Sequence, residues 1–226
     1  MPEPKTDRKA ERDLLLREIA AEYVQTAAWT GKAEMSGGVH AALSGVPREK
    51  FVPEVEAYLA YANMPLPIGH GQTISQPYMV AIMTDLLELS SSSVVLEIGT
   101  GCGYQAAVLA GLAKAVYTVE YVPELARAAA ERLARLGYAN VTVRTGDGFE
   151  GWPEHAPYDG IIVTCAASAV PPPLIEQLKA GGRIVIPIGA PFSFQDLVLV
   201  TKDADGGIHE KTLFPVAFVP LVHAAH

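Results

Sequence analysis

The chain has 226 residues, half of them hydrophobic, and a net charge of −8 at pH 7. This length suits one hydrophobic core, and the acidic charge argues against a nucleic-acid partner, because binding a phosphate backbone normally requires a basic face. The amino terminus is charged where a secretory signal is apolar, and no apolar run approaches the roughly 20 residues that span a bilayer, so we expect a cytoplasmic protein with no membrane partner.

The first 75 residues differ in pattern from the rest of the chain. The elements expected here and just beyond are an amphipathic helix near 8–28, a break at 36–38, a short helix near 39–44, Pro- and Gly-rich loops through 65–71, and a helix at 77–88. We predict that residues 1–75 form a helical and loop lid and that residues 76–226 form one compact domain.

From residue 94 onward, strand-like apolar runs alternate with helix-like segments. Strands are expected at 94–98, 115–119, 141–145, 160–164 and 183–188, and helices at 104–113, 123–136 and 172–179. This alternation predicts the α/β class, with a doubly wound and mainly parallel sheet covered by helices on both faces. Two later runs, 197–201 and 215–219, flank a turn signal at 205–207 and are expected to pair as antiparallel strands.

The first of these strands leads into a glycine-rich loop. Glu97 lies near the end of the strand, and the loop that follows consists of Gly99, Thr100, Gly101, Cys102 and Gly103. Alternating glycines permit a tight turn and let the main chain approach a ligand closely. The next strand leads to Glu120 and Tyr121, where the carboxylate of Glu120 can accept both hydroxyls of a ribose. Together these residues predict a nucleotide pocket.

Two nucleotide cofactors compete for this pocket. The loop also satisfies the loose dinucleotide fingerprint, with Ala106 in the last position. Glu97 favours S-adenosylmethionine over NAD, because a carboxylate can hold an ammonium group but repels a pyrophosphate. Asp147 and Gly148 form an acidic turn after the third strand, which can accept a hydrogen bond from an adenine amino group. Each of the three acids could instead be a strand end, a helix cap or a turn former, but together they share the edge where open α/β sheets bind ligands.

Ser75 stands just before the predicted helix at 77–88. A serine in this place suits a helix N-cap. A free hydroxyl at a helix N-terminus is also a natural site for a carboxylate, so both roles stay open.

The sequence predicts neither a disulfide nor a metal site. The two cysteines, Cys102 and Cys165, are expected to be reduced thiols in a reducing compartment. No spacing of metal-ligating residue types predicts a bound ion.

Several motifs together resemble one enzyme family. They are Leu66-Pro-Ile-Gly-His-Gly-Gln-Thr-Ile-Ser-Gln-Pro77, the glycine loop with its preceding acid, Gly146-Asp-Gly148, Ala156-Pro-Tyr-Asp159, Gln177-Leu-Lys-Ala-Gly-Gly-Arg183 and Val219-Pro-Leu221. The set resembles the protein-L-isoaspartate (D-aspartate) O-methyltransferase family from about residue 39 to 222. The most specific part is Gly-Gln-Thr-Ile-Ser-x-Pro at 71–77. Cys102 and Cys165 depart from the residues commoner in the family, but neither removes a group that the chemistry needs.

The resemblance implies a fold and an activity. The fold would be that of a Rossmann-like class I methyltransferase. The enzyme would transfer the methyl group of S-adenosylmethionine to the α-carboxylate of L-isoaspartyl and D-aspartyl residues in damaged proteins. The products would be S-adenosylhomocysteine and a methyl ester that closes to a succinimide.

The same resemblance assigns roles to residues. Ser75 would be the catalytic residue, and the enzyme would act as a monomer on isoaspartyl peptides and proteins. The methionine end of the cofactor would be bordered by Thr73, Ile74 and Ser75. The peptide groove would be lined by Pro67, Ile68, Val219 and Leu221.

Two other classes of function stay in view. One is a related methyltransferase with another acceptor, which would be either Asp of a biosynthetic peptide precursor or an RNA base. The acidic net charge argues against the RNA base. The other is a non-catalytic NAD-binding Rossmann protein. Glu97 and the Thr-Ile-Ser element at 73–75 disfavour this second class.

Overall fold

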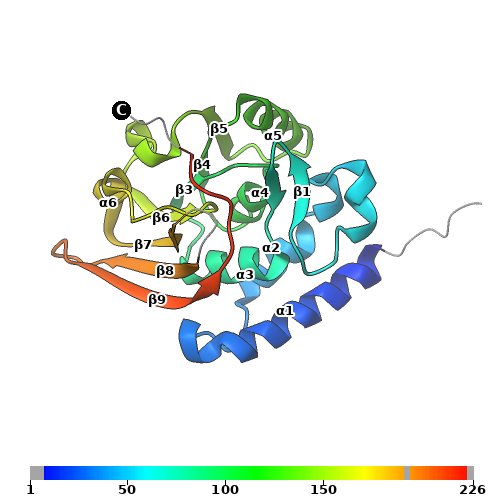
Figure 1. The fold of residues 1–226 in the computed structure, drawn as a ribbon, viewed down its shortest axis with the longest axis horizontal. Coiled ribbons are helices and arrows are strands. Elements are labelled where there is room, and N and C mark those ends of the chain that lie inside the picture. The colour runs from blue at the N-terminus through cyan, green and yellow to red at the C-terminus, as the bar shows by residue number, and fades with distance from the viewer. Residues whose placement is uncertain (1–7, 191–193, 223–226) are drawn as a thin grey trace, which may run out of the picture.

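The computed structural model describes residues 8–190 and 194–222. Its main feature is a seven-stranded sheet in the order β5-β4-β3-β6-β7-β8-β9 (Figure 1). The strands are β3 (Val94–Ile98), β4 (Ala115–Glu120), β5 (Val141–Thr145), β6 (Tyr158–Val163), β7 (Leu178–Gly189), β8 (Gln195–Lys202) and β9 (Ile208–Val216). The five strands from β5 to β7 are parallel, and β8 and β9 are antiparallel. The predicted mainly parallel α/β sheet is confirmed.

Helices cover both faces of the sheet. They are α1 (Arg8–Thr30), α2 (Gly37–Gly45), α3 (Pro77–Leu86), α4 (Tyr104–Ala110), α5 (Pro123–Arg135) and α6 (Pro172–Gln177), with short 3₁₀ turns at Arg48–Lys50, Glu54–Leu59, Gly148–Glu150 and Pro153–His155. Side chains along a strand point alternately to the two faces, so Val95 packs with α1–α4 and Leu96 packs with α6. No helix in the described part of the chain has the length and apolar composition needed to cross a membrane.

The chain adds β4 and β5 on one side of β3 and then crosses to add β6 and β7 on the other side. In open α/β sheets, the crevice at the carboxyl ends of the two strands at such a crossing is the usual place for a ligand. This crevice is where the glycine loop after β3 faces the residues after β6.

Three sequence-based expectations are wrong. Residues 65–71 are not only loops, because β1 (Leu66–Gly69) and β2 (Gln72–Ile74) form a hairpin around the positive φ angles of Gly69, His70 and Gly71. Residues 36–38 do not break a helix, because Ser36 caps α2 by accepting a hydrogen bond from the Val39 N–H. The last strand is Ile208–Val216 and not 215–219, because pairing of Lys202 with Ile208 sets its register from the turn onward.

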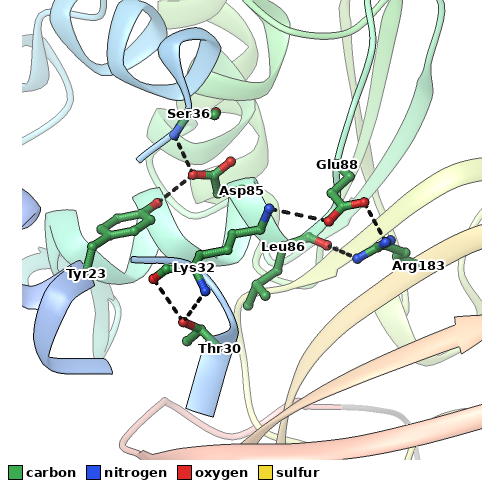
Figure 2. A network of polar contacts seen from close by, with 8 residues as sticks. All are labelled: Tyr23, Thr30, Lys32, Ser36, Asp85, Leu86, Glu88 and Arg183. Atoms are coloured by element: carbon green, nitrogen blue, oxygen red, sulfur yellow. Dashed lines mark hydrogen bonds and ion pairs between the residues drawn. The ribbon is translucent and has the colours of Figure 1, made fainter. Parts of the chain in front are cut away.

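The amino-terminal helix is tied to the rest of the chain by buried polar contacts (Figure 2). α1 lies along the outer side of α3 (Figure 1). Asp85 of α3 accepts hydrogen bonds from the Tyr23 hydroxyl of α1 (3.0 Å) and from the Ser36 N–H (2.9 Å). Nearby, Glu88 forms ion pairs with Lys32 and Arg183. Side chains from both sides of residue 75 pack in one hydrophobic cluster. The division of the chain into a lid of residues 1–75 and a domain of residues 76–226 stays a prediction. Residues 1–7 and 223–226, at the outer ends of these two segments, lie outside the described residues.

Candidate active site

Three pockets adjoin one another at the carboxyl edge of the sheet. The first, the glycine pocket, is lined by Gly99, Gly101, Glu120, Tyr121 and Gly148, among others. The second, the junction pocket, lies between residues 73–75 and the loop 99–102. The third, the groove, is lined by Glu22 and Thr26 of α1, by Ser75, Gln76 and Tyr78, and by 214–219. Thr73 and Thr164 line all three, so the pockets form one continuous site.

The glycine loop makes the tight turn that its sequence predicts. Gly99 has φ 94°, and a Cβ atom there would lie 2.4 Å from the Thr164 hydroxyl oxygen. That hydroxyl donates to the Gly99 carbonyl at 2.7 Å and joins the loop to the end of β6. Gly103 has φ 87° and is the N-cap residue of α4. A side chain at Gly99 would therefore displace the residue that connects the three pockets.

Glu120 faces the glycine pocket and is almost fully buried. Its Oε2 accepts a hydrogen bond from the Gly101 N–H (2.7 Å), and its Oε1 accepts one from the Val122 N–H (3.0 Å). An ionised carboxylate has about four acceptor positions. Two positions thus remain for the two hydroxyls of a ribose, while the backbone bonds hold the carboxylate in place.

Glu97 lies deeper than the sequence suggests. Its side chain is fully buried and lines none of the three pockets. Within the described residues, neither of its carboxylate oxygens makes a hydrogen bond of ordinary geometry. Burial raises the pKa of Glu97 to about 8. A buried carboxylate without a partner is costly unless it is protonated or meets a cation. A positively charged group placed next to Glu97 would therefore stabilise its ionised carboxylate.

The acidic turn after β5 contributes mainly backbone to the site. Asp147 Oδ1 accepts a hydrogen bond from the Phe149 N–H (2.9 Å). Gly148 lines the glycine pocket, and a Cβ atom there would lie 2.3 Å from Ile98 Cγ2. Only glycine fits at this position, and Asp147 lies beside the pocket without lining it.

Ser75 does not cap α3. The N-cap residue is Gln76, and Ser75 lines both the junction pocket and the groove. No partner for the Ser75 hydroxyl is present in the described part of the chain. Of the two roles that the sequence left open, the helix cap is wrong, and the hydroxyl is available to a ligand.

The four residues expected in a peptide groove lie in different places. Val219 lines both the groove and the glycine pocket, whereas Leu221 lines the glycine pocket alone. Ile68 packs near Gly101, and Pro67 is exposed. Neither Pro67 nor Ile68 lines any of the three pockets.

Sequence reasoning missed two residues that shape the site. Thr164 could have been noticed as a polar residue that follows an apolar strand. Gln195 is buried in β8 and binds the backbone N–H and carbonyl of Phe218 at 2.6 and 2.9 Å. It thereby holds the wall of the groove, a role for which the sequence carries no local signal.

Comparison with known proteins assigns the family. The model of the family described as Protein-L-isoaspartate(D-aspartate) O-methyltransferase matches residues 29–226. Protein-L-isoaspartate O-methyltransferase 2 of Syntrophobacter fumaroxidans is 56% identical over 94% of this chain and 86% of its own length. The protein of the same name from Polaromonas sp. is 57% identical over 92% of this chain and 98% of its own length.

The chain belongs to the protein-L-isoaspartate (D-aspartate) O-methyltransferase family. A solved structure supports the same fold. A Plasmodium falciparum protein, described as a protein-L-isoaspartate O-methyltransferase and solved in complex with S-adenosyl-L-homocysteine, has a TM-score of 0.77 at 25% identity, over 96% of this chain and 99% of that chain. The predicted Rossmann-like methyltransferase fold is confirmed, and membership in the isoaspartate methyltransferase family overturns the alternative of a non-catalytic NAD-binding protein.

Proposed function

We propose that this protein transfers the methyl group of S-adenosylmethionine to the α-carboxylate of L-isoaspartyl and D-aspartyl residues in damaged proteins. Family membership supports the activity. The observation that carries the assignment of roles is the position of Ser75, which lies where the junction pocket meets the groove and whose hydroxyl has no partner among the described residues. A methyl donor bound in the junction pocket can therefore meet an acceptor bound in the groove at Ser75.

The residues present fit the cofactor. The adenosine part would lie in the glycine pocket, with Glu120 accepting the ribose hydroxyls and the turn at Asp147 and Gly148 facing the adenine amino group. The methionine end would lie in the junction pocket against Thr73, Ile74, Thr100 and Cys102. Glu97 beneath the loop would balance the ammonium group. When bound, the cofactor supplies a methyl group on a positively charged sulfur.

The protein's own residues act by positioning. The acceptor carboxylate is already ionised at neutral pH, so no base is needed to activate it. The Ser75 hydroxyl would donate to one carboxylate oxygen and aim the other toward the junction pocket. The apolar side chains of Phe214, Val216 and Phe218 would exclude water from the reacting oxygen.

The site also supports proposals about assembly and location. Residues of a single chain line all three pockets, and we propose that the enzyme acts as a monomer. Cys102 and Cys165 are free and buried, as suits a reducing cytoplasm.

The proposed function can be tested directly. The protein is incubated with labelled S-adenosylmethionine and an isoaspartyl peptide, and both incorporated label and released methanol are measured. We expect rapid labelling and then methanol release at neutral pH, because the neighbouring amide nitrogen attacks the ester and closes the succinimide. An ester that stays intact for days would contradict the repair reaction and favour a carboxyl methyltransferase with another acceptor.

A further inference from the structure

The amino-terminal helix supplies the one carboxyl side chain among the described residues that line the groove. Of the described residues that line it, Glu22 alone is a carboxylate, and none is a lysine, arginine or histidine. Glu22 and Thr26 come from α1, and both precede the residues 29–226 that the family model matches. The charge of the groove is therefore set by a part of the chain outside the matched region.

Glu22 is held beside the proposed catalytic residue. Its Oε1 accepts hydrogen bonds from Gln76 Nε2 (3.3 Å) and from Asn63 Nδ2. Gln76 follows Ser75 directly, and Asn63 is itself fixed because its Oδ1 accepts from the Tyr78 N–H at 3.1 Å. The Glu22 carboxylate thus has a defined place, bound to the residue that follows Ser75.

The helix that carries Glu22 is itself anchored. The next residue, Tyr23, is buried and donates to Asp85 (Figure 2). One turn later, Thr26 shares a hydrogen bond of 2.5 Å with the Tyr78 hydroxyl. Both bonds join α1 to α3 within the four residues that follow Glu22, so Glu22 is part of a fixed groove wall.

The Glu22 carboxylate still has room for a cation. Both of its hydrogen bonds fall on Oε1, and no partner for Oε2 is present among the described residues. The side chain is half-buried, and burial raises the pKa of Glu22. Water screens a half-buried carboxylate less than an exposed one, so its negative charge would attract an approaching cation and repel an approaching carboxylate.

We propose that Glu22 selects isoaspartyl peptides that carry a lysine or arginine within two residues of the acceptor and disfavours those with an acid there. The inference rests on the proposed function of the groove. An extended peptide advances about 3.3 Å per residue, so a flanking side chain reaches Glu22 while the acceptor carboxylate lies at Ser75. A half-buried ion pair of this kind changes kcat/KM by roughly fivefold relative to a neutral residue.

The test uses isoaspartyl peptides that differ in one flanking residue. Lysine, glutamine or glutamate is placed in turn one and two residues before or after the acceptor, and kcat/KM is measured for each peptide. For the parent protein we expect lysine to exceed glutamate by at least about tenfold at one or more of these positions. In Glu22→Gln the ratio should fall to within about twofold, because the amide oxygen can still accept from Asn63 and Gln76 while the charge is gone.

A matched control removes a carboxylate elsewhere. Glu124 is exposed in the first turn of α5, and Glu124→Gln makes the same change in net charge away from the site. It should keep the parental ratio of lysine to glutamate peptides. In the parent, that ratio should also fall toward one between 50 mM and 1 M salt, a measurement that needs no variant to fold.

The outcomes separate the two proposals. A parent protein that methylates all flanking variants equally, or a Glu22→Gln variant that keeps the parental ratio, would overturn the role of Glu22 in selection and leave it as a structural tie between α1 and α3. Failure of the parent to methylate even the glutamine peptide would instead overturn the proposed function.

Discussion

The two ends of the site are built in different ways. The floor of the glycine pocket comes from residues 98–101 and 119–122, two successive strand ends of one sheet, and residues 72–73, 148, 164–165 and 219–222 complete its lining. The groove combines α1, the start of α3, and the segment 214–219 after β9, which are far apart in the sequence. The strand-end part of the glycine pocket therefore depends on local turns, whereas the groove depends throughout on long-range packing. We expect changes in the first to alter cofactor affinity, and changes in the second to alter turnover and choice of acceptor.

The largest expected effect tests the groove through its substrate. Normal aspartyl and isoaspartyl peptides carry equal charge, so electrostatics cannot separate them strongly, and the groove must distinguish them by geometry. A misplacement of about 1 Å can lower a rate on the order of 100-fold. We expect an isoaspartyl peptide to be methylated at least about 100-fold faster than its aspartyl twin, measured with labelled cofactor. Equal rates for the twins would show that the groove does not position the acceptor.

The second effect belongs to the glycine pocket. Glu120→Ala removes the acceptor for two ribose hydroxyls, and hydrogen bonds to a charged group contribute roughly 1.5–3 kcal/mol each. We expect S-adenosylhomocysteine to bind at least about 100-fold more weakly, as measured by calorimetry. Glu124→Gln, which lies outside the pocket, is the control. Binding within about twofold of the parent would refute the ribose assignment.

The third effect should appear at the boundary between the two ends. Ser75→Ala removes the hydroxyl that is proposed to orient the acceptor, so we expect kcat to fall by about tenfold or more, with little change in the Kd of S-adenosylhomocysteine. Because Gln76 is the N-cap of α3, no helix cap is lost and the melting temperature should stay close to the parental value. A variant with parental kcat and a clearly lowered melting temperature would assign Ser75 to the structure alone.

The smallest effect concerns the acid beneath the glycine loop. Burial raises the pKa of Glu97 to about 8 in the folded protein, above the value of 4.5 for the unfolded chain. Between these values the folded state holds a proton that the unfolded state has lost, so the stability of the free protein falls as the pH rises from about 5 to 8. In Glu97→Gln this loss should be absent. We expect its melting temperature to exceed that of the parent at pH 8 by roughly 3 °C or more, and the difference to shrink toward pH 5.

Adding S-adenosylhomocysteine should reverse the difference in melting temperature between the parent and Glu97→Gln. With saturating S-adenosylhomocysteine, the ionised Glu97 would pair with the ligand's ammonium group, so the parent should gain more thermal stability than Glu97→Gln. An equal gain in both proteins would place the ammonium group away from Glu97 and leave this acid as a purely buried residue.

Much of the fold and of the glycine pocket could be predicted from the sequence. The bounds of β3 and β5 agree with the expected strands to the residue, and the positive φ angles of Gly99, Gly101 and Gly103 agree with the expected tight turn. These features are local: an apolar run, a glycine or an acid at a strand end acts on its immediate neighbours. Their pattern is therefore visible along the chain.

Other features could not be predicted, because residue types alone do not fix the backbone angles of a turn or the register of strand pairing. The cap of α3 fell on Gln76 and not on Ser75, and the last strand began at Ile208 because its register follows from the turn after β8. The hairpin at 66–74 is not visible in its Pro- and Gly-rich pattern, because its pairing depends on the turn at 69–71.

The α/β class, the glycine loop and the acids at the strand ends follow from the amino-acid pattern, since parallel strands bring their carboxyl ends to one edge wherever the alternation holds. Only the tertiary structure decided how deep each acid lies and which side chains face the acceptor. Glu97 is buried with no hydrogen bond of ordinary geometry among the described residues, and Glu22 reaches the groove because Tyr23 and Asp85 fix α1 against α3. Depth and long-range contact arise from packing in three dimensions, and no local pattern of residues records them.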